Sequence, residues 1–133
     1  MGYKHDRGDL LAAAIAVAHE DGLSSLTFGR VAKRLGISDR VVVYYFPTKD
    51  DLVGEVIVGM GTQVQAALVP ALTEPAADHL DLLRRAWPVL ADEEADRAFA
   101  LFFEANGLAS AGRQPYASLV PHLVEGWIDW TAR

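Results

Sequence analysis

The chain contains no cysteine, and this absence removes several kinds of chemistry. Without thiols there is no disulfide, no thiolate zinc site and no thiol nucleophile. No long apolar run follows the first basic residues, so we expect no signal peptide. Charged residues such as Asp21, Asp50 and Glu55 interrupt the apolar stretches, so we also expect no membrane-spanning segment. These features are typical of a cytoplasmic protein that does not bind a membrane.

The chain also lacks a net positive charge, since the net charge of its 133 residues is −6. That charge is unusual for a protein that binds nucleic acid, but its distribution is uneven. Residues 1–53 hold seven basic and seven acidic residues, whereas residues 54–133 hold five basic and eleven acidic residues. Most of the basic residues in the neutral half fall within or beside the motif described next, which favours DNA contact. A solvated helix face is the alternative explanation for them.

Residues 27–52 have the pattern of two short helices joined by a tight turn. Thr27 can cap the first helix, and Gly36 can end it in the left-handed conformation. Ser38 can cap the second helix, which stops at Pro47. Two short helices joined by a glycine-containing turn are how a recognition helix is presented to the major groove of DNA.

This stretch resembles the N-terminal DNA-binding domain of the tetracycline-repressor (TetR) family of transcriptional regulators. The matching positions are Gly22-Leu23, Thr27, Val31-Ala32, Gly36-Ile37-Ser38, Tyr45-Phe46, Lys49 and Leu52. Arg40, Val42 and Val43 depart from the family pattern, which usually has glycine, leucine and tyrosine there. The resemblance implies a DNA-binding domain over residues 1–50 and a helical effector-binding and dimerisation domain over residues 51–133. We expect the second domain to be incomplete at its C-terminus, with a natural short chain and a different dimer surface as the alternative.

Apolar spacing predicts helices along the rest of the chain. The expected helices cover residues 4 or 9 to 21, 27–35, 38–46, 48–69, 78–87, 92–109 and 115–130. Pro70 is expected to end the fourth helix and Pro88 to kink or stop the fifth. A strand is the alternative for residues 56–58, but their spacing is helical. The expected fold class is all-α, with a three-helix helix-turn-helix head linked by a long fourth helix to a helical ligand-binding and dimerisation body.

We expect the second helix of the motif to pack inward through Val42 and Phe46 and to face DNA with its other side. The predicted DNA-contacting residues are Thr27, Ser38, Asp39, Arg40, Val41, Val43, Tyr44, Tyr45 and Lys49. Arg40 is assigned to base reading because a guanidinium can bond guanine O6 and N7 together. A phosphate contact or an ion pair with Asp39 is the alternative. Lys49 begins the next helix, where free N–H groups favour a phosphate, and a solvated lysine is the alternative.

Aromatic residues are frequent in the second half of the chain. They indicate either an apolar effector pocket, which the family resemblance implies, or the ordinary core of a helix bundle. The candidate effector-binding residues are Met60, Gln63, Val64, Trp87, Phe99, Phe102, Phe103, Tyr116, His122 and Trp127. No pair of residues has metal-ligand spacing and residues 59–61 form no phosphate loop, so we expect no metal and no cofactor. Glu104 and His122 belong to no catalytic constellation, so we do not expect an enzyme.

The expected function is therefore a DNA-binding transcriptional regulator. We expect a homodimer on palindromic double-stranded DNA, acting as a repressor that a small apolar effector releases. The alternative is a ligand-binding or assembly module of the same ancestry that no longer reads DNA. Asp39, Val43 and the neutral N-terminal half keep that alternative open.

Overall fold

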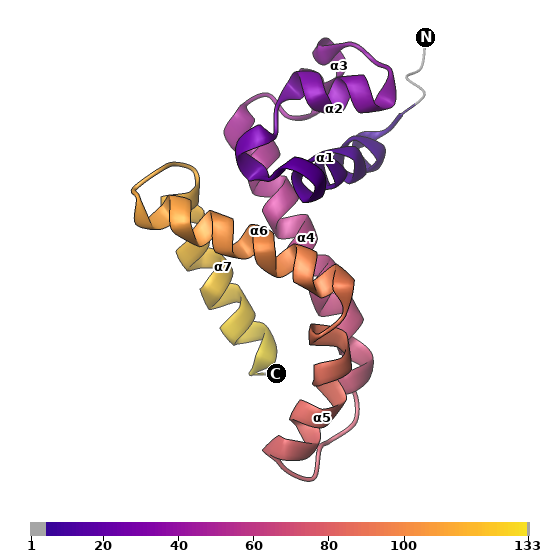
Figure 1. The fold of residues 1–133 in the computed structure, drawn as a ribbon, viewed down its shortest axis with the longest axis vertical. Coiled ribbons are helices and arrows are strands. Elements are labelled where there is room, and N and C mark those ends of the chain that lie inside the picture. Colours follow the sequence, from indigo (N-terminus) through magenta and orange to yellow (C-terminus); the bar gives the residue numbers. More distant parts are fainter. Residues whose placement is uncertain (1–4, 133) are drawn as a thin grey trace.

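The computed structural model describes residues 5–132, and these residues form helices without any strand. The elements are α1 (Arg7–Asp21), the 3-10 turn η1 (Leu23–Ser25), α2 (Phe28–Leu35), α3 (Asp39–Tyr45), α4 (Lys49–Leu72), α5 (His79–Leu90), α6 (Glu93–Ser110) and α7 (Tyr116–Thr131). Helices α1–α3 form a head around the first half of α4, and α5–α7 form a body along the rest of it (Figure 1). The all-α prediction is confirmed, while Lys4 and Arg133 lie outside the described residues.

The helix-turn-helix motif forms because each of its helices has the predicted cap. The Thr27 hydroxyl oxygen accepts a hydrogen bond of 3.1 Å from the backbone N–H of Arg30. The Ser38 hydroxyl oxygen accepts one of 3.2 Å from the backbone N–H of Arg40. Between them Gly36 ends α2 at φ +67°, a left-handed conformation that favours glycine. The caps predicted from the sequence are confirmed.

The core of the head joins all four N-terminal helices. Its largest fully buried side chains are Leu10, Leu23, Leu26, Val31, Val42, Phe46, Leu52, Val53 and Val56. Burying such a side chain contributes roughly 1.5–3 kcal/mol. A glycine lets α1 approach α4 closely, because a Cβ on Gly59 would lie 3.2 Å from Cδ1 of Ile15. The head is therefore fixed against the first half of α4.

Helix α4 is longer than predicted, because Pro70 does not end it. The helix continues to Leu72. A proline in the last turn removes a single backbone hydrogen bond, and the Thr73 hydroxyl donates a bond of 2.6 Å to the Val69 carbonyl nearby. The strand alternative for residues 56–58 is wrong, since they lie inside this helix.

By length and composition alone, α4 is apolar enough to cross a membrane. The expectation that charged residues interrupt every apolar stretch is wrong for it, because residues 56–72 carry no charge. One such helix is weak evidence for a span, since the core helix of a soluble protein passes the same test. Here α4 packs against α1, α5 and α6, and its first half is part of the head core.

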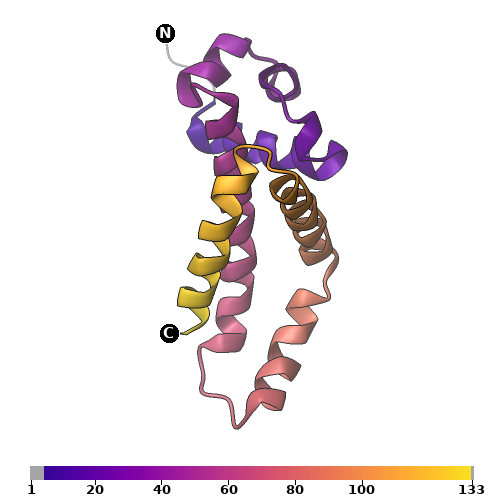
Figure 2. The same cartoon turned by 90° about the vertical axis from the view of Figure 1, so that its left-hand side faces the viewer.

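Helix α5 lies at the far end of the body from the head (Figures 1 and 2). Leu80, Leu83 and Trp87 have the spacing of one apolar helix face, but all three are exposed. Helix α5 packs on α4 with its other side, and none of its residues is fully buried. Pro88 does not stop the helix at residue 87, because it lies in the last turn.

Helices α6 and α7 pack on each other and complete the body. Helix α6 crosses α4 below the head and also contacts α1 and η1 (Figure 1). Its buried residues are Ala95, Leu101 and Ala105. Helix α7 runs through Pro121 as one helix. The body thus touches the head through α6 as well as through the continuous α4.

Candidate functional site

Helix α3 has a buried side and an exposed side. Val42 and Phe46 are buried, as the sequence predicts, and Tyr44 is 71% exposed. Asp39, Arg40 and Val43 are exposed as well. This outer side is therefore free to meet a partner such as DNA.

The structure corrects one residue of the predicted DNA-facing set. Val41 is only 8% exposed and belongs to the head core. In a helix, positions i, i+1, i+4 and i+5 share one side, so Val41 and Val42 turn inward together with Tyr45 and Phe46. Val41 is thus not available to touch thymine methyl groups, and Val43 is the exposed valine of this helix.

Two of the basic residues of the helix-turn-helix motif, Arg30 and Arg34, form ion pairs with acidic residues of the head. Arg30 lies 2.9 Å from a carboxylate oxygen of Asp21. Arg34 contacts both carboxylate oxygens of Glu20, at 2.8 and 2.9 Å. These pairs tie α2 to α1. They explain part of the basic charge in the motif without DNA.

The other basic side chains of the motif are differently placed. Lys33, Arg40 and Lys49 are exposed, and none of them forms an ion pair within residues 5–132. In particular, the alternative ion pair between Arg40 and Asp39 is not formed among the described contacts. Three positive charges on the motif are therefore available for phosphate or base contacts.

The predicted polar contacts surround α3. Lys49 is the first residue of α4, whose free N–H groups favour an anion. The hydroxyls of Thr27 and Ser38 accept capping bonds, which leaves each proton free to be donated to a phosphate. Tyr45 is half-buried and stacks edge-on with Tyr44, with ring centres 5.1 Å apart.

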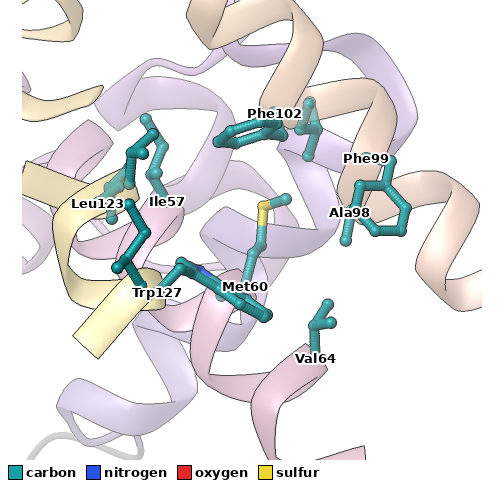
Figure 3. A pocket seen from close by; sticks show the side chains of 12 residues that line it. Ile57, Met60, Val64, Ala98, Phe99, Phe102, Leu123 and Trp127 are labelled. Atoms are coloured by element: carbon teal, nitrogen blue, oxygen red, sulfur yellow. The ribbon is translucent and has the colours of Figure 1, made fainter. Parts of the chain in front are cut away.

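An apolar cavity of about 290 Å³ lies in the body between α4, α6 and α7 (Figure 3). The predicted effector residues that line it are Met60, Val64, Phe99, Phe102 and Trp127. Trp127 reaches across to α4, because a Cβ on Gly61 would lie 3.5 Å from the indole nitrogen. Among the twelve lining residues, this indole N–H is the side-chain group that can donate a hydrogen bond to a ligand. Ligand pockets have volumes of roughly 300–1,000 Å³, so this cavity is near the lower end of that range.

Sequence reasoning missed several lining residues. They are Ile57, Gly61, Ala98, Leu101, Leu123, Val124 and Ile128. Their spacing is that of any buried helix face, so periodicity does not separate a cavity wall from a packed core. Gly61 has no side chain to signal its position, and its role depends on the approach of Trp127.

Five predicted effector residues lie away from the cavity, and one of them, Gln63, lines the second hollow described below. Trp87 and Phe103 are exposed to solvent, and His122 is exposed on α7, 3.8 Å from Glu125. Tyr116 is buried in the main core, and that burial raises its pKa above the ordinary value, with the charge of Glu104 adding to the effect. Phe103, Tyr116 and His122 share α6 or α7 with lining residues but point in other directions, whereas Trp87 lies on α5, which contributes no residue to the cavity.

A second, more polar hollow of about 670 Å³ lies between α1, α4, α5 and α6. Gln63 lines this hollow rather than the apolar cavity, together with His19 and Arg97. Burial lowers the pKa of His19, and the nearby Arg97 adds to the shift. Nδ1 of His19 is buried without a hydrogen-bond partner among the described atoms. Within residues 5–132 no group of three or more His, Asp or Glu side chains is placed to hold a metal ion.

The head of this chain is similar to a known protein family. The family model described as "Bacterial regulatory proteins, tetR family" matches residues 10–56, which cover most of α1, all of η1, α2 and α3, and the start of α4. The resemblance predicted from the motif is confirmed over this segment. No curated protein gives a significant match to the chain.

A solved structure extends the likeness to the body. The ketosteroid transcriptional regulator KstR2 of Mycobacterium tuberculosis is similar to this chain, with a TM-score of 0.68 and 24% sequence identity. The alignment covers 95% of this chain and 64% of that regulator, so this chain spans less than two thirds of its length. At this identity the likeness shows a shared fold, which is a helix-turn-helix head on a helical body.

Proposed function

We infer the function from the premise that residues 10–56 of this chain belong to the tetR family of bacterial regulatory proteins. We propose a transcriptional regulator that binds double-stranded DNA through α3 as a homodimer. A small apolar ligand that binds in the body makes the protein release DNA. The DNA-bound protein acts as a repressor, and it does so in the cytoplasm. The observation that carries the proposal is the exposed outer side of α3, with Arg40 on it and Lys49 beside it, neither of which forms an ion pair within residues 5–132.

The proposed contacts follow from the chemistry of each exposed group. Arg40 reads a base pair, because its guanidinium matches the two acceptors of guanine. Val43 meets a thymine methyl group, and the Tyr44 hydroxyl donates to a phosphate. Lys49, with the free N–H groups of α4, holds a second phosphate. Asp39 repels phosphate and accepts from cytosine, which restricts the sequences that fit.

We propose that the division of work follows the two halves of the chain. The head, up to about residue 50, contacts DNA, and the body holds the ligand cavity. The acidic body repels DNA, so binding depends on a few basic groups placed on the head. We therefore expect affinity to fall steeply with salt, as it does for contacts to phosphates.

The test of the function is selection of duplex DNA from a random pool by the intact protein at low salt. We expect enriched sequences that are palindromic, with half-sites about one helical turn, 10–10.5 base pairs, or a multiple apart. Footprinting on the enriched site measures protection of both half-sites. If no sequence is enriched and low salt gives no protection, the chain does not read DNA.

The second candidate function is a ligand-binding module that has lost DNA binding. Asp39 on the outer side of α3 favours it, because a carboxylate there opposes phosphate contact. The two functions differ in one cheap measurement. A DNA-binding regulator is retained on immobilised duplex DNA at low salt and released at high salt, whereas the ligand-binding module is not retained at either.

Two substitutions separate base contacts from phosphate contacts. Lys49→Ala should weaken binding to all sequences and lower the slope of log affinity against log salt by about one. Arg40→Ala should relax the preference at one base-pair position in each half-site and cost about 1–3 kcal/mol on the selected sequence. Arg84→Ala, an exposed position on α5, serves as the control and should change neither quantity. If Arg40→Ala and Lys49→Ala behave alike across an operator library, Arg40 contacts phosphate instead of a base.

A further inference from the structure

Glu104 on α6 holds the turn between α1 and α2 of the head. Its carboxylate accepts hydrogen bonds from the backbone N–H of Leu23 at 2.6 Å and of Ser24 at 3.2 Å. The Ser24 hydroxyl donates a third bond to it at 3.0 Å. The donors and the acceptor are 80 and 81 residues apart in the chain. One carboxylate of the body thus accepts three hydrogen bonds from the head.

The turn is shaped for this contact. Leu23 and Ser24 begin η1, where backbone N–H groups have no partner within the turn itself. Gly22 precedes them at φ +88°, and a Cβ there would lie 3.2 Å from a carboxylate oxygen of Glu104. Only a residue without a side chain lets the carboxylate come so close in this backbone conformation. Hydrogen bonds to a charged acceptor are about twice as strong as neutral ones.

The same helix forms part of the wall of the apolar cavity. Leu101 and Phe102 line the cavity, and Glu104 follows Phe102 by two residues. Leu101 and Ala105 are buried in the core that head and body share. Because packed interiors transmit strain, we expect residues 101–105 of α6 to move together. A displacement of Phe102 by a ligand is therefore passed to the Glu104 carboxylate along less than one turn of helix.

We propose that Glu104 is a positioning residue that fixes the orientation of the head on the body and transmits movement of α6 to the α1–α2 turn. This route is separate from α4, which joins the two parts covalently. The effect of Glu104 on DNA binding rests on the proposed function, whereas the effect of Glu104 on the orientation of the head does not. Without the Glu104 contact, the head together with the first half of α4 takes a wider range of angles to α6.

The orientation is measured directly with two spin labels. Because the chain has no cysteine, Lys33→Cys on α2 and Arg84→Cys on α5 label the head and the body of the intact protein at exposed positions. We expect a narrow distance distribution in the otherwise unchanged protein and a broader or shifted one with Glu104→Ala. Glu104→Gln, which keeps the acceptor but not the charge, should fall between them.

The matched control is Glu93→Ala, because Glu93 is an exposed carboxylate on the same helix. It should leave the distance distribution unchanged. If Glu104→Ala folds poorly, Glu104→Gln decides alone, since it preserves the size of the side chain. The proposal is overturned if the Glu104 variants that fold give the distribution of the unchanged protein.

Loss of the Glu104 contact is expected to make DNA binding less selective for the distance between the two half-sites. The intact protein is tested on its selected site and on the same site with the half-sites moved two base pairs apart. We expect Glu104→Ala to reduce the ratio of the two affinities about tenfold, a coupling of ordinary size, with affinity for an isolated half-site unchanged. An unchanged ratio contradicts the proposal. If the unchanged protein binds no DNA, the proposed function fails, and the label distances still decide the role of Glu104.

Discussion

Replacing Phe46 by alanine is expected to cost about 3–5 kcal/mol of unfolding free energy. Phe46 follows α3 directly and is 1% exposed, so its ring fills the junction between α3 and the start of α4. The Arg7 guanidinium lies 4.9 Å from the ring centre and also pairs with Glu55 at 3.0 Å. The substitution therefore leaves a cavity and loosens a contact between α1, α3 and α4. Since whole domains have stabilities of about 5–15 kcal/mol, this loss is a large fraction of the total.

The measurement is urea unfolding followed by circular dichroism, which reports on the helices of both head and body. Tyr44→Ala is the matched control, because it removes an aromatic ring two residues before Phe46, at a position that is 71% exposed. It should change the unfolding free energy by no more than about 0.5 kcal/mol. Equal losses for Phe46→Ala and Tyr44→Ala would show that burial does not distinguish the two sides of α3.

The head could be predicted closely because its signals are local. Caps at Thr27 and Ser38 and the left-handed glycine at Gly36 act within a few residues, so the sequence alone determines where these helices begin and end. Val41 shows the limit of such signals. In a helix of two turns, the pair Val42 and Phe46 defines an inward direction, but the width of the buried side depends on the neighbouring helices.

The body was harder to predict because its contacts are distant in sequence. The spacing of Leu80, Leu83 and Trp87 correctly indicates an apolar helix face, but periodicity does not say what covers that face. The two prolines at 70 and 88 were given too much weight, since a proline in a final turn removes little of the hydrogen bonding. The three bonds of Glu104 had no sequence signal, because they join segments 80 residues apart.

Phe102 and Phe103 show the same limit at the candidate ligand site. They are adjacent on α6, and nothing in the sequence favours either one as a lining residue. In the structure Phe102 lines the apolar cavity, whereas Phe103 is 69% exposed. The difference comes from how α6 is rotated against α4 and α7, which is a property of the packed helices. This pair therefore provides a sharp test of the cavity as a ligand site.

We expect a small neutral apolar molecule to bind in the cavity and to weaken DNA binding. The probe is N-phenyl-1-naphthylamine, whose fluorescence rises in an apolar site. At saturation it should reduce affinity for the selected DNA by about 5- to 150-fold, the usual range of coupling between two sites. The physical reason is that Met60 and Val64 on α4 and Phe102 on α6 line one cavity. A ligand that separates these helices shifts α4, which begins in the head.

Phe102→Ala should alter the affinity for the probe, whereas Phe103→Ala should leave it unchanged, and both measurements use the intact protein. Coupling of binding free energies is reciprocal, so saturating DNA must weaken probe binding by the same factor by which the probe weakens DNA binding. A bundle core without a ligand function predicts no such pair of equal effects. If the probe binds in the cavity but both factors equal one, the cavity is not coupled to DNA binding, and release of DNA needs another site.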